Sequence, residues 1–111
     1  MDIYFKTKKL QKICNELNEA IKKLGPKMAK KLQQRLMELH AAINLEDISR
    51  VPPPRCHPLT GNRAGHLSVD LVHPHRLLFI PANNPIPELD DGGLDWSKVT
   101  EVEIVGIVDT H

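Results

Sequence analysis

The 111-residue sequence is poor in cysteine and in aromatic residues. It contains two cysteines, Cys14 and Cys56, and 4% Phe, Trp and Tyr. Two cysteines without a paired spacing provide neither a disulfide framework nor a structural zinc module. The shortage of aromatic rings leaves little surface on which nucleic-acid bases could stack. Disulfide scaffolds, zinc fingers and aromatic-lined binders of single strands are therefore poor descriptions of this chain.

Long apolar runs are also missing. No stretch reaches the roughly 18 apolar residues of a membrane span, and the opening Met-Asp-Ile-Tyr-Phe lacks the charged and apolar regions of a secretory signal. The hydrophobic content of 41% and the charged content of 26% are typical of globular proteins. We therefore expect one domain over residues 1–111, soluble and cytoplasmic, with no membrane partner.

Charge is distributed unevenly along the chain, although the net charge is only +1. Residues 1–50 contain eleven Lys and Arg against six Asp and Glu, whereas residues 81–111 contain one Lys against seven acidic residues. A basic front and an acidic tail fit a protein with a polyanion-binding face. They fit a solvated helix followed by an acidic loop equally well, so charge alone leaves both interpretations open.

Apolar spacing predicts a short strand and two helices in the first half. Ile3 to Phe5 have strand propensity. Thr7 can cap a helix that ends before Gly25, and Pro26 suits the first turn of the next. The leucines expected in the core are Leu17, Leu24, Leu32, Leu36 and Leu39. Because Lys27, Lys30, Lys31 and Arg35 fall largely outside the apolar stripe, we expect a helical hairpin with a basic outer face.

From Cys56 onward the apolar period changes to two, which predicts strands. Leu67, Val69 and Leu71 share one face, and after a turn at 73–75 the next strand begins at Arg76. Residues 81–98, rich in proline, glycine and acidic residues, are expected to form an inserted loop. A final strand, 99–108, should place Val102, Ile104 and Val108 on one face.

The predicted fold class is therefore α+β. It consists of an N-terminal strand, a two-helix hairpin and a mainly antiparallel sheet, with the helices on one side of the sheet.

Imidazole and guanidinium groups concentrate where the second half begins. The loop from Arg55 to His66 leads directly into a strand, and the chain ends in Asp109-Thr-His111. Cleavage of RNA without a metal needs a base for the 2′-hydroxyl, an acid for the leaving 5′-oxygen and a cation at the phosphate. Histidine and arginine serve these roles. The side chains of the required types are His57, His66, His111, Arg63 and Arg76.

Other interpretations of the same residues stay open. His73 and His75 with Cys56, His57 or His66 could form a zinc or copper site, although Pro74 and the lack of a Cys-x-x-Cys pair argue against it. Arg76 could be a structural partner of Asp70 across a hairpin, and Arg63 could only decorate a turn. Trp96 could anchor the acidic loop to the core or contact a partner.

The stretch His57-Pro-Leu-Thr-Gly-Asn-Arg-Ala-Gly-His-Leu-Ser-Val69 resembles the RelE/ParE superfamily of bacterial toxins, most closely its HigB branch. That branch typically has His-Pro-Leu-Lys-Gly-Asp-Arg-Lys-Gly here, followed by an aromatic residue and Ser. An arginine in its next strand corresponds to Arg76, and its frequent Tyr-His terminus corresponds to Asp109-Thr-His111. The resemblance covers most of the chain.

This resemblance implies a toxin of a type II toxin–antitoxin system that cuts mRNA in the ribosomal A site. Cleavage would use the RNA 2′-hydroxyl, with no metal or other cofactor. Its partners would be the ribosome, mRNA and a helix-turn-helix antitoxin, through which the complex would oligomerise. By position, His57, Asp109 and His111 would be the acid–base groups, and Arg63 and Arg76 the phosphate contacts. RNA would also contact Thr60, His66, Lys27, Lys30, Lys31 and Arg35.

The sequence departs from the branch's pattern near the predicted site. Thr60 replaces a lysine, Asn62 an aspartate, Leu67 an aromatic residue and Thr110 a tyrosine. These replacements remove a cation and two rings. They keep a second hypothesis open, in which the chain is a non-catalytic binding module. Such a module would block translation by occupancy, act on a gyrase-type target or serve only as an antitoxin's partner.

Overall fold

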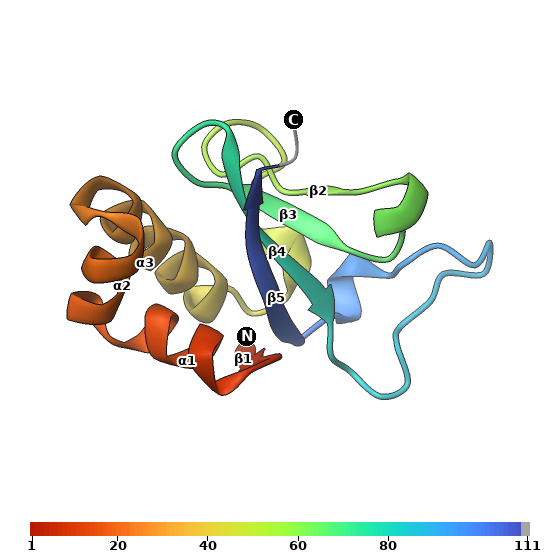
Figure 1. Cartoon of the computed structure of the whole chain (residues 1–111). Coiled ribbons are helices and arrows are strands. Elements are labelled where there is room, and N and C mark those ends of the chain that lie inside the picture. The colour runs from red at the N-terminus through yellow and green to blue at the C-terminus, as the bar shows by residue number, and fades with distance from the viewer. Residues whose placement is uncertain (110–111) are drawn as a thin grey trace.

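The computed structural model describes residues 1–109. A five-stranded sheet carries helices on one side (Figure 1). The helices are α1 (Lys8–Asn15), α2 (Leu17–Leu24) and α3 (Pro26–Ala41), with short 3₁₀ turns η1 (Leu45–Asp47), η2 (Gly61–Arg63) and η3 (Trp96–Lys98). The strands are β1 (Asp2–Phe5), β2 (His57–Pro58), β3 (Leu67–Asp70), β4 (His75–Pro81) and β5 (Glu101–Asp109).

The sheet has the order β1-β5-β4-β3-β2. β1 pairs with β5 in parallel, and the other neighbours are antiparallel. The order of elements and the mainly antiparallel sheet confirm the predicted α+β class. β1 and β5 are joined through the helices and the three other strands rather than by a tight turn, and a long connection of this kind permits parallel pairing.

The first predicted helix is two helices. Thr7 caps α1 by accepting a hydrogen bond from the Leu10 amide (3.1 Å), as expected. At Glu16 the backbone becomes extended (φ −119°, ψ 110°), which ends α1 and starts α2 in a new direction. Leu17 comes directly after this break and is 46% exposed, so its predicted place in the core is wrong. Leu32 and Leu39 are buried as predicted.

The structure corrects the prediction that Arg35 lies on the basic outer face of α3. The Arg35 side chain is 2% exposed, with Nε donating to the Asp70 carbonyl oxygen (2.7 Å) and Nη1 to the Glu38 carboxylate (3.0 Å). A period-3.6 pattern treats every arginine as polar and hence exposed. Here, however, the guanidinium is satisfied internally, which lets it be buried between α3 and the end of β3. Arg35 therefore cannot serve as a surface contact for RNA in this conformation.

A β-bulge in β5 determines which residues face the core. Leu78 pairs with Gly106, but Phe79 pairs with Ile104, so Val105 is an extra residue. The bulge puts Ile107 opposite the buried Leu77 and against the core, and moves Val108 to the other face. The prediction that Val108 shares a face with Val102 and Ile104 is wrong for this reason. Strict alternation has no signal for an inserted residue.

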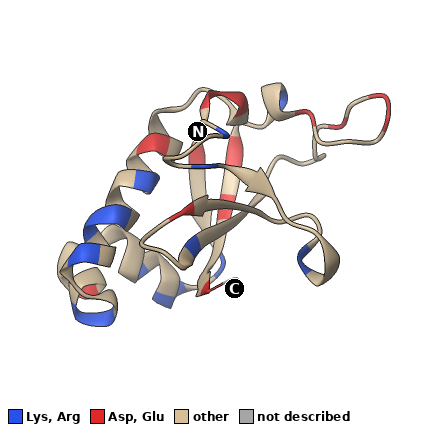
Figure 2. Cartoon of the chain, turned by 90° about the horizontal axis from the view of Figure 1, so that it is seen from above, with Lys and Arg blue, Asp and Glu red and all other residues tan. Residues whose placement is uncertain are grey.

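The acidic segment after β4 projects from the body of the protein. Figure 2 shows much of the Lys and Arg on the helices at one end of the molecule and acidic residues on this loop at the other, with further acidic residues on the strands between them. The Trp96 ring belongs to the core and stacks under the Arg50 guanidinium (3.7 Å to the ring centroid). Trp96 therefore anchors the base of the loop, as one of the two sequence interpretations predicted. Among residues 1–109, no helix is long and apolar enough to cross a membrane.

Candidate functional site

The face of the sheet turned away from the core carries a cluster of polar side chains from three neighbouring strands. His57 lies opposite Ser68, Asp70 lies opposite Arg76, and Arg76 lies opposite Val108. Residues that are directly opposite each other share a face. The next residue pair, Val69 and Leu77, is buried in the core, which fixes the polar set on the other side. The register thus gathers polar side chains at one end of the sheet.

Three of these residues, together with Arg55 just before β2, form what we call the polar ring: Arg55, His57, Asp70 and Arg76. Arg55 donates two hydrogen bonds to the Asp70 carboxylate, from Nε to Oδ2 (2.8 Å) and from Nη2 to Oδ1 (2.9 Å). Arg76 Nε lies 3.7 Å from Asp70 Oδ1, and Arg76 Nη1 lies 3.2 Å from His57 Nε2. His57 Nδ1 closes the ring at 3.2 Å from the Arg55 carbonyl oxygen.

The two neighbours of His57 define its protonation pattern. Arginine can only donate hydrogen bonds, so Nε2 accepts from Arg76 and carries no proton. A carbonyl oxygen can only accept, so Nδ1 carries the proton and donates to Arg55. The two contacts fit the tautomer with the proton on Nδ1 and with the Nε2 lone pair directed at the Arg76 guanidinium. A lone pair beside a fixed cation suits proton transfer next to an anionic phosphate.

Arg55 occupies an uncommon backbone conformation. Its φ of 56° lies in the left-handed region, which residues other than Gly, Asn and Asp seldom adopt. Hydrogen bonding to Asp70 raises the pKa of the Arg55 guanidinium, so this residue stays charged. Strained residues of this kind gather at functional sites when their surroundings hold them in place. Here the ion pair with Asp70 supplies part of that restraint.

The cysteines do not add a nucleophile to this site. Burial raises the pKa of both Cys14 and Cys56 to about 12, which keeps the thiols protonated near neutral pH. Among residues 1–109, no group of three His, Cys, Asp or Glu side chains is placed to hold a metal ion. The grouping of His73 and His75 with Cys56, His57 or His66 that could have formed a metal site is therefore not assembled in the described part of the chain.

The structure separates Arg63 and His66 from the polar ring. Both residues lie in the connection between β2 and β3, at the end of β3 remote from Asp70 (Figure 1). His66 Nδ1 lies 3.2 Å from the Arg63 carbonyl oxygen, and Thr60 precedes the same 3₁₀ turn with an exposed side chain. These three predicted contacts form a second polar area at the tip of the hairpin, at the other end of β3 from the pair of Asp70 and Arg76.

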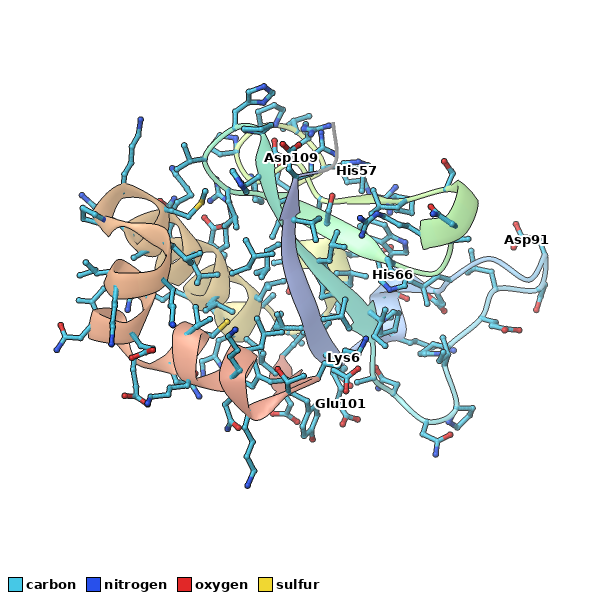
Figure 3. All side chains as sticks on the ribbon, in the orientation of Figure 1. Lys6, His57, His66, Asp91, Glu101 and Asp109 are labelled. Atoms are coloured by element: carbon cyan, nitrogen blue, oxygen red, sulfur yellow. The ribbon has the colours of Figure 1, made fainter. Side chains whose placement is uncertain are left out.

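Asp109 and His57 lie at the same end of the sheet (Figure 3). The register pairs Asp109 with His75, one position beyond the pair of Arg76 and Val108. Because successive side chains of a strand point to opposite faces, the Asp109 side chain lies on the opposite face of the sheet from Arg76. The other terminal candidate, His111, lies outside the described residues.

The predicted basic contacts on α3 differ from one another in exposure. Lys27 and Lys30 are exposed and Lys31 is half-buried, whereas Arg35 is buried. The three lysines remain available to a polyanion, and Arg35 is instead a link between α3 and the polar ring through the Asp70 backbone.

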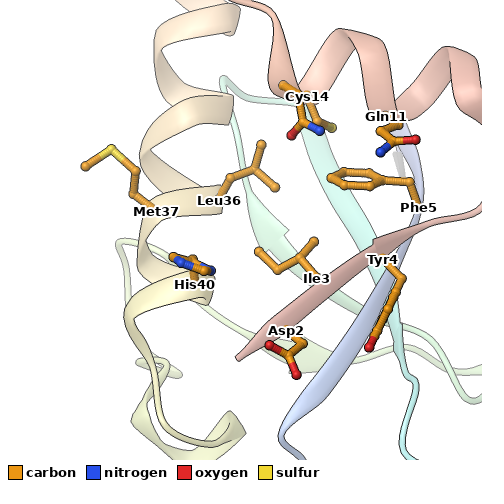
Figure 4. A pocket seen from close by; sticks show the side chains of 10 residues that line it. Asp2, Ile3, Tyr4, Phe5, Gln11, Cys14, Leu36, Met37 and His40 are labelled. Carbon is orange, nitrogen blue, oxygen red and sulfur yellow. The ribbon is translucent and has the colours of Figure 1, made fainter.

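A separate groove of about 790 Å³ lies between β1, α1 and α3. Figure 4 shows side chains of β1 facing those of α3 across it. Its apolar lining includes Ile3, Phe5, Leu36 and Met37, of which Met37 is 70% exposed. This groove shares no lining residue with the polar ring, so the molecule offers a polar site and an apolar groove as distinct surfaces.

Comparison with solved structures places this architecture among known toxins. A YoeB/ParE toxin from Agrobacterium tumefaciens superposes over the full length of both chains with a TM-score of 0.60 at 12% sequence identity. The chain has a RelE/ParE-like fold. A YoeB–YefM complex from Staphylococcus aureus matches this RelE/ParE-like fold over all of this chain and 97% of that chain, with a TM-score of 0.55 and 16% identity. No family model matches the sequence, and no curated protein matches it. The HigB branch therefore stays a prediction.

Sequence reasoning placed His57 and Arg76 as candidates, and the structure brings these two into contact. The sequence also suggested a pair of Arg76 with Asp70 as an alternative, and the structure has this pair, with Arg76 Nε 3.7 Å from Asp70 Oδ1. Sequence reasoning gave Arg55 no role, although it begins the same loop. The signal that could have found it is its position two residues before His57, where its backbone carbonyl can reach the histidine's ring.

Proposed function

We propose that this protein is the toxin of a type II toxin–antitoxin system and cleaves mRNA on the ribosome without a metal. The observation that carries the proposal is the direct contact between His57 Nε2 and the Arg76 guanidinium, on the face of the sheet turned away from the core in a RelE/ParE-like fold. A fold hosts many functions, so this contact supports the proposal more than the architecture does.

The proposed reaction is a transesterification within the RNA. A base removes the proton from a 2′-hydroxyl, whose oxygen attacks the adjacent phosphorus. The bond from phosphorus to the 5′-oxygen breaks, and an acid protonates that leaving oxygen. The products are a 2′,3′-cyclic phosphate and a free 5′-hydroxyl, and no electrons are transferred to or from the protein.

His57 would act as the base once an incoming phosphate draws Arg76 away from its Nε2 and frees the lone pair, while Nδ1 stays bonded to the Arg55 carbonyl oxygen. The Arg76 guanidinium would bind the phosphate and stabilise the negative charge that develops on the phosphate oxygens. The sequence resemblance assigns the remaining proton transfer to the chain end, where His111 is the candidate, because the Asp109 side chain lies on the opposite face of the sheet from Arg76. Thr60 and His66, on the neighbouring hairpin tip, would contact the RNA on either side of the cut.

The test is to add the purified chain to an mRNA, with and without translating ribosomes, and to map new 5′ ends. The proposal predicts cuts within the reading frame that require ribosomes. Translation inhibited without cuts would favour the non-catalytic binding module instead. Neither cuts nor inhibition would direct the search to another target, such as a gyrase-type enzyme.

Lysines on α3 should supply salt-dependent attraction to the ribosome. Replacing Lys27, Lys30 and Lys31 with alanine should weaken binding and reduce the slope of log affinity against log salt by about 2, because each phosphate contact contributes roughly 0.7–0.9. Ribosome binding measured across a potassium chloride series checks this result. Lys98→Ala, which lies beside the acidic loop, should leave the slope unchanged; an unchanged slope in the triple variant would contradict the assignment.

We further propose that an antitoxin covers the apolar groove between β1, α1 and α3. β1 is an edge strand of the sheet. The backbone amides of Asp2 and Lys6 donate hydrogen bonds toward β5, so the backbone groups of the alternate residues Ile3 and Phe5 point away from β5. Lys8 and Lys12 lie on the same helical face as the groove-lining Gln11 and Asn15. An extended segment with apolar and acidic side chains would complement this surface. Helix-turn-helix character in the partner comes from the resemblance alone.

Met37→Asp should weaken antitoxin binding about 10- to 100-fold, since it removes roughly 1.5–3 kcal/mol of apolar burial. The cognate antitoxin, titrated calorimetrically, provides the measurement. Ile43→Asp replaces another exposed apolar residue outside the groove and is the matched control. Equal affinity of the two variants would place the antitoxin elsewhere.

A further inference from the structure

We propose that Arg55 and Asp70 are positioning residues that set the tautomer of His57 and the orientation of Arg76. The catalytic consequence of this pairing rests on the proposed function, whereas the effect on His57 can be measured without RNA. The Arg55 backbone accepts a hydrogen bond from one member of the polar ring, and its side chain binds another.

The backbone of Arg55 is fixed from several sides. Its amide donates to the Val51 carbonyl oxygen (3.1 Å), and the following Cys56 amide donates to Ser49 (2.9 Å). Just before it, the Pro54 carbonyl accepts from the Asp70 amide (2.8 Å). These bonds hold residue 55 at its positive φ and aim its carbonyl oxygen at His57 Nδ1. A strained residue so restrained works as a fixed acceptor.

Asp70 is held from the opposite side of the sheet. Its backbone oxygen accepts from the buried Arg35, which is itself paired with Glu38 on α3. Its carboxylate accepts two short bonds from Arg55. The connection from α3 through Arg35 therefore fixes Asp70 in place, and Asp70 in turn presents one carboxylate to two arginines.

The distances show which arginine Asp70 holds more strongly. The carboxylate lies 2.8 and 2.9 Å from Arg55 nitrogens but 3.7 Å from Arg76 Nε. Because Arg55 is the closer partner, its positive charge offsets most of the negative charge of the Asp70 carboxylate. Arg76 is then oriented by Asp70 without being neutralised by it, and keeps its charge for an incoming phosphate.

Removing the Arg55 side chain should change both neighbours. The Asp70 carboxylate would turn its full charge toward Arg76 and draw the guanidinium away from His57. His57 Nε2 would lose its donor, which leaves only the residue-55 carbonyl oxygen to favour a proton on Nδ1 and lets the tautomer protonated at Nε2 become populated. A catalytic imidazole in a mixture of tautomers, beside a displaced arginine, should lower kcat more than it raises KM.

The experiment is a two-bond and three-bond ¹H–¹⁵N correlation spectrum of the histidine rings of the full chain at mildly alkaline pH. In the wild type, His57 should show a protonated Nδ1 and an unprotonated Nε2. Arg55→Gly keeps the positive φ accessible while removing the side chain, and Asp70→Asn removes the carboxylate charge. Both variants should show a mixture of tautomers at His57, and their kcat for mRNA cleavage should fall about 100-fold. Lys98→Ala is the control for loss of one exposed charge.

The outcomes separate this proposal from the proposed function. A wild-type His57 protonated at Nε2, or an unchanged tautomer in both variants, would overturn the positioning role whether or not the protein cuts RNA. The expected tautomers in a protein that does not cut RNA would support the positioning role and contradict the proposed function. If Arg55→Gly does not fold, Arg55→Lys retains the charge without the two-point contact, and it should show the same mixture.

Discussion

Replacing His57 with alanine should lower the rate of ribosome-dependent mRNA cleavage by about 10²- to 10⁴-fold, the usual contribution of a positioned general base. The ring nitrogen Nε2 lies 3.2 Å from the Arg76 guanidinium, and the neighbouring Nδ1 is fixed by the Arg55 carbonyl oxygen. Alanine removes the proton acceptor and leaves the cation in place. Single-turnover cleavage of mRNA on programmed ribosomes measures the effect.

The control for this substitution is His40→Ala, which removes an imidazole from the exposed end of α3. It should leave the cleavage rate unchanged. His57 is half-buried and lies outside the core cluster, so His57→Ala should retain its circular dichroism spectrum and its affinity for antitoxin. Cleavage by His57→Ala at the wild-type rate would remove His57 from the mechanism.

Arg35→Ala should lower the free energy of unfolding by about 3 kcal/mol, the low end for breaking a buried ion pair. The guanidinium is almost fully buried, while its partner Glu38 retains 35% exposure and regains some hydration when Arg35 is lost. The larger cost comes from the Asp70 carbonyl oxygen, which loses its donor, and from the cavity left beside α3. Urea unfolding followed by circular dichroism measures the change.

Lys30→Ala is the matched control for Arg35→Ala, because it removes a positive charge from the exposed face of the same helix. Its stability should stay within about 0.5 kcal/mol of the wild type. The two substitutions thus distinguish a structural arginine from surface lysines. Equal stability of the two variants would mean that Arg35 is not the link between α3 and β3.

The order of elements could be predicted from the sequence because apolar periodicity reports directly on helix and strand. Pro26 and Gly25 mark the start of α3, and the alternation of Leu67 and Val69 marks a strand face, as the structure confirms. The two wrong predictions about regular elements, one continuous first helix and strict alternation in the last strand, have a common cause. At Glu16 and Val105, the backbone departs from regular geometry at residues whose type permits either conformation. No local pattern announces such a break or bulge.

The candidate site was predictable in its residue types but not in its connections. His57 and Arg76 are separated by 18 intervening residues, and only the strand register brings them within 3.2 Å. Arg35 was misplaced because periodicity cannot tell a solvated guanidinium from one satisfied by a backbone oxygen across the core. Arg55 was missed because its role depends on a positive φ and a carboxylate fifteen residues away.

Sequence identities of 12% and 16% to the structurally similar toxins mean that the fold can be carried over and the chemistry cannot. Thr60 and the small number of aromatic residues show that this chain lacks side chains the resemblance would supply. The polar ring is the feature that argues for retained catalysis, because it supplies an oriented imidazole and a charged guanidinium at one point.

The most direct test of this account uses an mRNA with a single 2′-deoxy nucleotide on the 5′ side of the cleaved bond, placed on programmed ribosomes. The proposed mechanism uses the 2′-hydroxyl as the nucleophile, so the protein should cut the unmodified mRNA and leave the 2′-deoxy mRNA intact at that position. Equal cleavage of both mRNAs would show that another nucleophile attacks the phosphate, and the role assigned to His57 and Arg76 would be wrong.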